Sequence, residues 1–413
     1  MFQAMKNLAV NPTVTRKPVL LGRPPLLRQT NAEILLRLLR ESGPSSKADL
    51  VRASGLSAPS VTNVVGTLIS AGLVETVGEG DSTGGRPPDI LRFKAEHGCV
   101  AGVEITRDAL RFLITDLNGR ELIRSETPIE RSKSTPRLIC RQIAKQLWEL
   151  LQRKRLIRKQ LLTVTVGVPA IVNVDDGTVL AFTALRDWDR VPLGPMLARE
   201  LKCTVFVDND TNLAAQGEFH SGAARGEGDF VFITVGEGVG AGIFLNGSIY
   251  RGSQWSAGEI GYLRVPDISR EHPSIHKYGK LETALSASGI LRSWRATSQA
   301  PIRSRVIRVA DIWDLAASGN AEAKRLLRQR ATILADVILD LALILNPNLI
   351  LLGGAVGNHP ALLREMNALL EGSEFAVSRM ALGTLGISAT LWGAISIGLE
   401  PTILRLIQTP LQR

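Results

Sequence analysis

The sequence predicts an α/β protein in two parts: a helical module that ends in a β-hairpin, and a larger domain of alternating strands and helices. Apolar residues spaced by three and four between residues 30 and 71 predict helices. Short apolar runs between turn signals begin after His97 and predict strands. At 413 residues the chain is long enough for about two or three domains with a sizeable core.

The helical module is expected to begin with two capped helices. Thr30 and Glu33 have the spacing of a capping box, and apolar residues follow them at helical spacing. Ser46 and Asp49 begin a second, shorter helix. The turn over residues 54–57 contains a glycine, the residue that adopts left-handed backbone angles most easily.

A third helix is predicted from about residue 58 to residue 71, with its apolar side chains on one face. A glycine-rich stretch over residues 78–85 then separates two short apolar runs, which indicates a β-hairpin. This order of elements is typical of a winged helix-turn-helix. The apolar positions of the third helix are Val61, Val64, Val65, Leu68 and Ile69.

The outward face of the third helix carries small and hydrogen-bonding side chains, which suit base edges and phosphates in a major groove. Arg86, in the wing, is placed to follow a phosphate or to enter a minor groove. An ordinary polar surface helix is the alternative, but the ordered set of elements favours DNA binding. The expected contacts are Ser57, Ser60, Thr62, Asn63, Thr67 and Arg86.

The larger domain reads as strands interrupted by helices, with two similar βββαβα units. Such a repeat indicates an internally duplicated, two-lobed, actin-like architecture. The final segment, residues 386–406, is predicted as a strand followed by a helix. Strands are expected at 100–105, 110–115, 122–125, 163–168, 204–207, 229–235, 241–245 and 349–352, and long helices at 136–156 and 321–345.

Composition narrows the classes of partner and compartment. The net charge of +10, from 49 Lys and Arg against 39 Asp and Glu, favours an acidic partner such as nucleic acid. Cys99, Cys140 and Cys203 lie far apart, which fits a reducing compartment. No apolar stretch of about 18 residues and no signal peptide are recognised, so we expect a cytoplasmic protein without a membrane partner.

Several motifs resemble the N-terminal domain of ROK-family repressors of the xylose and N-acetylglucosamine type, and the rest resembles the ROK sugar-kinase domain. The resemblance implies an actin-like, ribonuclease H-like fold. We expect a flexible basic tail (1–25), a winged helix-turn-helix (26–96) and a ROK domain (97–413). Its small lobe would comprise about 97–210 with about 391–413, and its large lobe about 211–390. The motifs are RQTN (28–31), ASGLS (53–57), VTNVV (61–65), LISAGLV (68–74), GGRPP (84–88) and AGEIG (257–261).

A sugar site is predicted where an apolar strand ends at Asn209 and Asp210, because amide and carboxylate groups hydrogen-bond sugar hydroxyls. The resemblance implies that Asp210 matches the catalytic base of the kinases. It also implies that Glu259 and Glu282 match sugar-contacting positions. The alternatives are a helix cap for Asp210 and solvated or paired carboxylates for the two glutamates.

The zinc site of the family is not expected here. Tyr262 stands where the resemblance places a zinc-binding His, and residues 275–281 contain no cysteine. His272 and His276 have a helical spacing but no Cys or third ligand near them in sequence. We therefore predict no metal and no cofactor.

Phosphoryl transfer is also predicted to be lost. In the first phosphate element, residues 102–108, the expected Mg²⁺-binding aspartate and both glycines are missing, and side chains at Glu104 and Ile105 are expected to obstruct phosphates. The second and third elements persist as glycines and are expected to be vestigial. Catalysis in such enzymes is positioning and charge stabilisation, so loss of one element suffices. The vestigial glycines are Gly236, Gly238, Gly240, Gly353 and Gly354.

Together these observations predict a DNA-binding transcriptional regulator, a repressor of carbohydrate metabolism, that responds to a sugar or sugar derivative. Its partners would be a double-stranded DNA operator and the sugar effector, and it would be a homodimer or homotetramer. An active ROK sugar kinase with an accessory DNA-binding domain is the alternative. A regulator controlled by a partner protein is a third reading.

Overall fold

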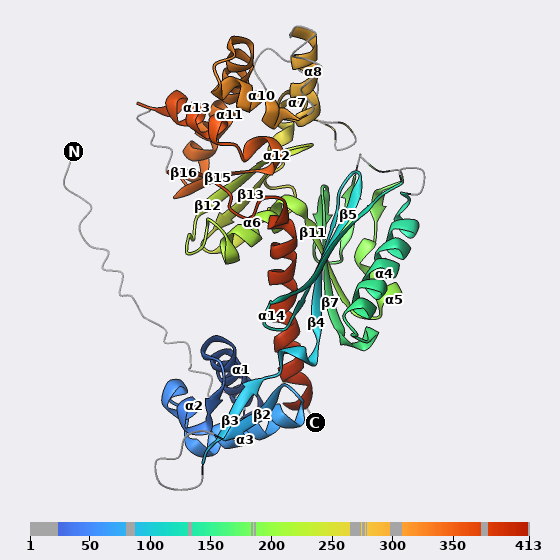
Figure 1. Cartoon of the computed structure of the whole chain (residues 1–413), viewed down its shortest axis with the longest axis vertical. Helices are drawn as coiled ribbons and strands as arrows, with labels where there is room; N and C mark the ends of the chain where they lie inside the picture. The colour runs from blue at the N-terminus through green and yellow to red at the C-terminus, as the bar shows by residue number, and fades with distance from the viewer. Residues whose placement is uncertain are drawn as a thin grey trace, which may run out of the picture. The chain divides into compact units, whose positions relative to one another are not determined.

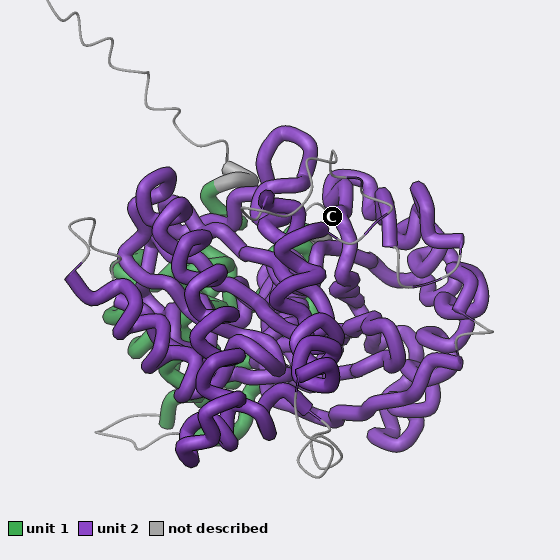
Figure 2. The backbone as a smooth tube through the Cα atoms, turned by 90° about the horizontal axis from the view of Figure 1, so that it is seen from above, with its two compact units in different colours: residues 1–94, 404–413 green, residues 95–403 purple. Residues whose placement is uncertain are grey.

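The computed structural model describes residues 24–79, 87–130, 134–182, 185, 187–264, 274, 277, 279–297, 308–372 and 379–411. The chain forms two compact units, residues 1–94 with 404–413 and residues 95–403 (Figure 2). The second unit begins close to the domain limit expected from the sequence. The last residues of the chain, however, group with the first unit and not with the second, in which they were expected. The finer domain limits stay predictions.

The helices of the first unit begin largely where the sequence indicates. Ser46 caps the second helix in a full capping box with Asp49, and Gly55 ends it with a φ of 69°. The predicted cap at Thr30 is wrong, because the first helix already begins at Pro24 and Thr30 lies inside it. Proline is favoured in a first helical turn. The helices are α1 (Pro24–Ser42), α2 (Lys47–Ser54) and α3 (Ala58–Ser70) (Figure 1).

A small antiparallel sheet completes this unit, with strand order β1-β3-β2. Its apolar core joins the three helices to the sheet and confirms the winged helix-turn-helix outline. Ile69 differs from expectation, because its side chain is 42% exposed. The strands are β1 (Ser45–Ser46), β2 (Val74–Glu79) and β3 (Asp89–Phe93), and the core includes Leu35, Leu50, Val61, Val65, Leu68 and Leu91.

The second unit contains two sheets with the same topology. In the first sheet the order is β11-β7-β4-β5-β6, with β4, β5 and β6 antiparallel and β7 and β11 added in parallel. In the second sheet β12, β13 and β14 are antiparallel and β15 and β16 are added in parallel, in the order β14-β13-β12-β15-β16. The shared order confirms the predicted internal duplication (Figure 1).

The strands of the first sheet are β4 (Cys99–Ile105), β5 (Ala109–Asp116), β6 (Glu121–Pro128), β7 (Leu161–Val168) and β11 (Thr204–Asn209). Helices α4 (Pro136–Arg153) and α5 (Leu193–Leu201) cover one face of this sheet (Figure 1). A small sheet packs beside it, formed by β8 (Ile171–Asn173), β9 (Thr178–Ala181) and β10 (Asp189–Val191).

The strands of the second sheet are β12 (Phe230–Val235), β13 (Val239–Leu245), β14 (Ser248–Tyr250), β15 (Leu349–Gly353) and β16 (Arg379–Leu382). Alternate residues of β12 face opposite cores. Ile233 packs among the helices of the outer layer, whereas Phe232 packs toward α6 (Asp210–Ser221). The helices of the outer layer include α7 (Lys280–Leu285), α8 (Ala287–Thr297), α10 (Val309–Ala317), α11 (Ala321–Leu345) and α13 (Pro360–Leu370). Short helical turns are η1 (Ala95–His97), η3 (Arg158–Gln160), η4 (Ile260–Tyr262) and α12 (Gly354–Gly357).

Helix α6 crosses the last helix, α14 (Ala389–Leu411), at two glycines. A Cβ atom on Gly217 would lie 2.3 Å from the carbonyl oxygen of Ala389, and one on Gly393 would lie 1.7 Å from that of Leu213. Only glycine fits at both places, so the two backbones touch. Because α6 follows the first sheet and α14 follows the second, this crossing joins the two lobes.

A buried carboxylate fixes the segment that precedes α14. Glu218 is fully buried, and its side chain accepts hydrogen bonds from the amides of Ala223, Thr384 and Leu385 and from the Thr384 hydroxyl, at 2.8–3.2 Å. The strand predicted after residue 386 is wrong. Gly386, with a φ of 54°, begins the short turn η5 (Gly386–Ser388), which leads directly into α14.

One segment, Gly386–Gln408, is long and apolar enough to cross a membrane by length and composition alone. However, 56% of its most apolar window is buried inside the protein. Its Thr402 hydroxyl, for example, bonds the Thr163 hydroxyl of the first sheet in a buried contact of 2.5 Å. Such burial is typical of a core helix, so the composition of α14 carries no argument for a membrane span.

Candidate functional site

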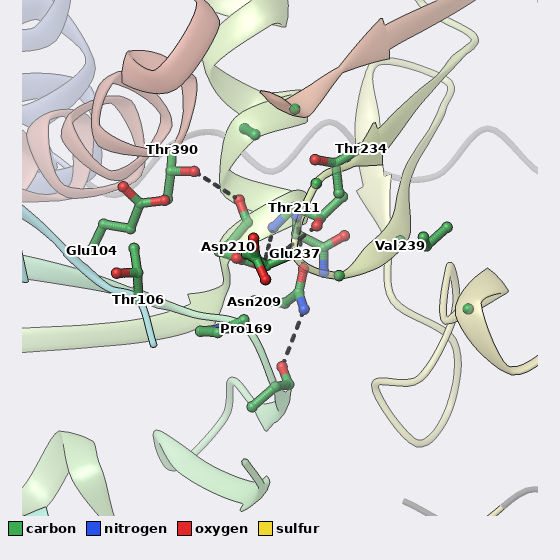
Figure 3. Close-up of a pocket in the computed structure, with 18 of the residues that line it drawn as sticks. Glu104, Thr106, Pro169, Asn209, Asp210, Thr211, Thr234, Glu237, Val239 and Thr390 are labelled. Atoms are coloured by element: carbon green, nitrogen blue, oxygen red, sulfur yellow. Dashed lines mark hydrogen bonds between the residues drawn. The ribbon is translucent and has the colours of Figure 1, made fainter. Parts of the chain in front are cut away.

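A cavity of about 720 Å³ lies within the second unit, where α6 begins and where the two sheets end (Figure 3). Its volume is in the usual range of small-molecule sites, about 300–1,000 Å³. The four residues expected to bind sugar, Asn209, Asp210, Glu259 and Glu282, all line it. The structure therefore brings together residues that are up to 73 positions apart in the sequence.

Asn209 and Asp210 lie at the start of α6, and their side chains make different hydrogen bonds. Asn209 is the helix cap: its Oδ1 accepts from the Asn212 amide at 3.0 Å, and its Nδ2 donates to the Ala170 carbonyl at 3.2 Å. Asp210 is not the cap. Its Oδ1 accepts from the Thr211 amide at 2.7 Å, and its Oδ2 makes no hydrogen bond to the described residues. Asp210 is thus the freer of the two toward a ligand.

Glu259 and Glu282 complete a group of acidic side chains on this wall. The side chain of Glu259 forms no hydrogen bond with the described part of the chain, whereas Glu282 accepts from the Gly279 amide at 3.3 Å in the first turn of α7. Burial, and then the neighbouring Asp210 and Glu282, raise the pKa of Glu259 to about 7. Burial raises the pKa of Asp210 to about 7 as well, with the charge of Glu104 adding to the effect.

Tyr262 lines the same wall, in place of the histidine that the family resemblance implies. Burial, and then the charges of Glu259 and Glu282, raise the pKa of its hydroxyl to about 12, so it stays a hydrogen-bond donor. His272 and His276 lie outside the described residues. No group of three metal-ligating side chains occurs within the described ranges. The expectation of no zinc remains a prediction.

The opposite wall carries a row of charges set by strand register. Glu104 pairs with Arg111 across β4 and β5, and Arg111 pairs with Glu126 across β5 and β6. Arg111 donates to both carboxylates at 3.1 Å. Ile105 does not obstruct the cavity, contrary to expectation, because it is fully buried in the core of the first sheet. Neighbouring residues of a strand face opposite sides, so Glu104 alone faces the cavity.

The turn between β4 and β5 uses its polar groups internally. The Thr106 hydroxyl accepts from the amides of Asp108 and Ala109 at 3.4 and 3.0 Å. The Thr106 amide donates to the Ala109 carbonyl. These are the backbone groups that a phosphate-binding turn would offer to its ligand. Side chains at Thr106 and Arg107 also occupy the tip, so no open backbone cradle is present there.

The glycines of the third element are explained by packing, and two glycines of the second element have local contacts of their own. A Cβ on Gly353 would lie 2.2 Å from the Phe232 ring, and one on Gly354, whose φ is 80°, would lie 2.4 Å from the Val235 carbonyl oxygen. Gly240 is close to the Thr211 side chain. The Gly236 amide is bonded within its own turn, to the Gly238 carbonyl. Retention of Gly353 and Gly354 therefore gives no argument for bound nucleotide.

Three residues of the cavity region were missed by the sequence reasoning. Arg107 and Trp255 line the cavity, and Trp255 has an unusual φ of 58°. Arg251 forms an ion pair with the buried Asp208, at 2.5 Å, directly before the Asn209 cap. Positive backbone angles and ion pairs between distant segments leave no signal in a single sequence. Arg107 could have been noticed as a charged residue in the place of a glycine.

Four of the expected DNA-binding residues of the first unit lie on α3, Ser57 is its N-cap, and Arg86 is outside the described residues. Thr62 and Asn63 are exposed and form no side-chain hydrogen bond with the described residues. The other three are partly engaged: Ser57 caps α3 and meets the Ser60 hydroxyl at 2.8 Å, and Thr67 donates to the Asn63 carbonyl at 3.1 Å. Thr62 and Asn63 thus have the least engaged side chains of the five residues that the structure describes.

The two units define a class: a helix-turn-helix module joined to a duplicated, two-lobed domain with a carboxylate-lined cavity. Comparison with protein families agrees with this. The IclR helix-turn-helix domain matches residues 32–78, and the ROK family matches residues 100–397. The ROK match covers more than half of the chain. The chain belongs to the ROK family.

The chain is similar to the xylose repressor of Bacillus subtilis, with 24% identity over 83% of this chain and 86% of that protein. It is 29% identical to the N-acetylglucosamine repressor of Escherichia coli O157:H7 over 65% of this chain and 66% of the relative. A solved ROK-family transcriptional regulator, described as a homologue of the Escherichia coli MLC protein, aligns with a TM-score of 0.72 and 24% identity, covering 93% and 98% of the two chains.

These comparisons confirm the predicted family, the fold class and the class of transcription regulator. The named relatives are repressors, so the kinase alternative is not favoured. The roles of individual site residues are not tested by such comparisons, and they stay proposals.

Proposed function

We propose that the protein is a transcriptional repressor of carbohydrate metabolism whose DNA binding responds to a sugar or sugar derivative in the cavity of the second unit. One observation carries the proposal. The cavity is lined by Asn209, Asp210, Glu259 and Glu282, whose groups suit sugar hydroxyls, while the turn at Thr106 and Arg107 carries side chains in place of glycines, in a chain that also has a helix-turn-helix unit.

The acidic wall supports sugar recognition by its chemistry. Asp210 Oδ2 and both oxygens of Glu259 are free of protein partners among the described residues, and carboxylate oxygens accept hydrogen bonds from sugar hydroxyls. Tyr262 adds a donor. Asn209, whose side chain is already bonded twice, would contribute its remaining amide hydrogen. Its main effect would be to hold Asp210 in place.

Helix α14 gives the ligand site a continuous connection to the DNA-binding unit. Its first residues, Ala389 and Thr390, line the cavity, and the Thr390 hydroxyl donates to the Asp210 carbonyl at 3.3 Å. Residues from Leu404 onward belong to the first unit. A ligand that changes the closure of the lobes at the α6–α14 crossing would therefore bias the DNA-binding unit. Such coupling needs only a difference in ligand affinity between two states.

The proposed partners are a double-stranded operator and a small-molecule sugar, acting on a homodimer or homotetramer in the cytoplasm. A symmetric dimer would read two half-sites, as helix-turn-helix dimers do. Control by a partner protein in place of a sugar is the competing reading for the effector.

The test is selection of double-stranded DNA by the full-length protein from a random library, followed by binding measurements with a sugar panel present. We expect salt-dependent binding that at least one sugar weakens. Asn63→Ala should change which sequences are preferred, because it removes a base-contacting side chain. Failure to select any sequence would contradict the DNA-binding role. Selection without a response to any sugar would point to a partner protein as effector.

A further inference from the structure

Gly66 stands in the middle of the exposed face of α3 and leaves a gap in it. Residues Thr62 and Asn63 lie one turn before it on this face, and Ser70 lies one turn after it. All four positions are exposed. The helix, which runs APSVTNVVGTLIS, has no charged side chain. At its centre, the surface offered to a partner is therefore bare backbone.

Nothing in the fold requires a glycine here. A Cβ atom at Gly66 would meet no heavy atom of the described residues within 4 Å, and its backbone is ordinary helix without a positive φ. This sets it apart from Gly217 or Gly393, where a Cβ would collide with backbone. Glycine in a helix interior is also less favourable than alanine. The fold alone would thus be better served by alanine at this position.

We propose that Gly66 allows the backbone of α3 to approach DNA closely, so that Thr62 and Asn63 reach base edges. The inference rests on the proposed function and names the residue that determines how deeply α3 enters the major groove. Short side chains such as these reach base edges only when their helix lies deep in the major groove. A side chain at position 66 would meet the DNA first and hold the helix away.

Opposite effects on stability and on DNA affinity provide the test. In the full-length protein, Gly66→Ala should raise the melting temperature of the first unit by about 4–8 °C, from its higher helix propensity. The same variant should bind DNA selected by the wild-type protein at least about tenfold more weakly. Gly66→Leu should lose more than about a hundredfold, because a larger side chain separates the surfaces further.

A matched control adds bulk to an exposed helix position elsewhere. Ala317, in α10 of the second unit, is exposed, and Ala317→Val should leave DNA affinity within about twofold. Gly66→Ala with wild-type DNA affinity would overturn the inference and leave the DNA-binding role intact. A fall in both melting temperature and affinity would also overturn it, because it would show that the fold needs the glycine. Absence of DNA binding by the wild type would instead contradict the proposed function.

Arg107 carries a second, independent inference in the cavity. It lines the cavity at the turn between β4 and β5, and it forms no ion pair within the described parts of the chain. Its Nε atom is buried and has no hydrogen-bond partner among the residues that the structure describes. Arg111, the other arginine of the lining, is bound by both Glu104 and Glu126. A buried donor of a charged group without a partner is costly, which indicates that a ligand completes it.

We infer that the natural ligand carries an anionic group, a phosphate or a carboxylate, that Arg107 receives. Arginine binds both groups with paired, charge-assisted hydrogen bonds. Figure 3 places Thr106, the neighbour of Arg107, on the other side of Asp210 from Val239, whose backbone bonds Glu282. The ligand would therefore place its hydroxyls at the carboxylates and its anion at the former phosphate turn. This inference deepens the proposed sugar-binding role.

Matched sugars test it on the full-length protein by thermal shift and by release of selected DNA. The probes are glucose, N-acetylglucosamine and xylose, each with its phosphorylated and its acid form. At least one anionic form should bind about tenfold or more tightly than its neutral parent, and whether it is a phosphate or an acid identifies the group. Arg107→Gln should remove this advantage without changing binding of the neutral parent, and Arg107→Lys should keep part of it.

Two outcomes would overturn the anion inference. In one, neutral sugars bind and no anionic form binds better, and then the sugar-binding role still stands. In the other, Arg107→Gln binds the preferred anionic sugar as tightly as the wild type. If no probe binds in any form, both the anion inference and the sugar-binding role would be contradicted.

Discussion

The two ends of the cavity, one at Asp210 and one at the turn between β4 and β5, carry different chemical groups. At one end Asp210, Glu259 and Glu282 still converge, and two of these carboxyls have free oxygens. At the other end Thr106 and Arg107 fill the turn where glycines would admit a phosphate. Under the proposed function, the comparison teaches that a binding function and a catalytic function housed in one cavity can be lost separately. Sugar recognition needs only the first end, whereas phosphoryl transfer needs both.

The glycines of the third phosphate element show why the sequence alone suggests a more complete phosphate-binding end of the cavity than the structure supports. The Phe232 ring and the Val235 carbonyl leave no room for a Cβ atom at Gly353 and Gly354, whether or not a phosphate binds there. Packing constraints therefore preserve the appearance of a nucleotide site after its first turn has been replaced. The turn at Thr106 has no such constraint, since its tip faces the cavity.

The largest expected effect of the replaced turn is the loss of sugar phosphorylation. With ATP, Mg²⁺ and any sugar that binds, we expect no ADP release above background, because a base without a positioned phosphoryl group has nothing to transfer. A coupled ADP-release assay measures this, with Asp210→Asn as the control for contaminating kinase. Sustained release that disappears in Asp210→Asn would restore the kinase alternative.

Elemental analysis of the same preparation should find no stoichiometric zinc.

The next largest effect concerns the carboxylate end. Asp210→Asn and Glu259→Gln should each weaken a confirmed sugar ligand by about 5- to 150-fold, since a lost partner for a buried hydroxyl costs about 1–3 kcal/mol. Isothermal titration or thermal shift measures the affinity. Both replacements preserve side-chain size, so melting temperatures serve as the control for folding. Unchanged affinity in both variants would mean that the sugar binds elsewhere.

A smaller effect is expected in the pH dependence of stability. Burial raises the pKa of Asp210 and of Glu259 to about 7, from 3.8 and 4.5, so the folded state holds protons that the unfolded chain has released. Stability without ligand should therefore fall as pH rises from about 4 to 7. Between pH 6 and 8 each group should contribute roughly 1 kcal/mol. Melting curves over this range should be flatter for Asp210→Asn, and equal slopes would contradict the raised values.

The smallest effect is expected from Glu104, which belongs to the phosphate end. Glu104→Gln should change sugar affinity by less than about threefold, because Arg111 still has Glu126 as a partner. The charge of Glu104 helps to raise the pKa of Asp210, so the pH midpoint of the preceding experiment should move down. A loss of sugar affinity as large as that of Asp210→Asn would place Glu104 in the sugar site, and the two ends of the cavity would then not differ in function.

Local patterns in the sequence predicted much of the fold. The capping box at Ser46, the turn at Gly55 and the bounds of α11 follow from side chains within a few residues of one another. The cap at Thr30 was wrong because two prolines allow α1 to begin earlier. The strand expected after residue 386 was wrong because Gly386 and the Glu218 carboxylate impose a turn.

The candidate site was predicted only in part, for a similar reason. Asn209, Asp210 and Glu259 stand in recognisable motifs, so their presence in the cavity could be expected. The row of Glu104, Arg111 and Glu126 depends on the register of three strands, which the sequence does not specify. Whether Arg107 finds an ion-pair partner depends on what surrounds it in space, and no such partner lies among the described residues. Such relations between distant segments become visible only when the chain is folded.

The buried Glu218 has a consequence for hydrogen exchange. The amides of Thr384 and Leu385 lie outside any helix or strand, yet both donate to this fully buried carboxylate. They should exchange with solvent as slowly as amides inside a helix, and only when the segment separates from α6. Gly386 and Ile387 of the same segment line the cavity. The exchange rates of the Thr384 and Leu385 amides would therefore measure how often this part of the cavity lining opens.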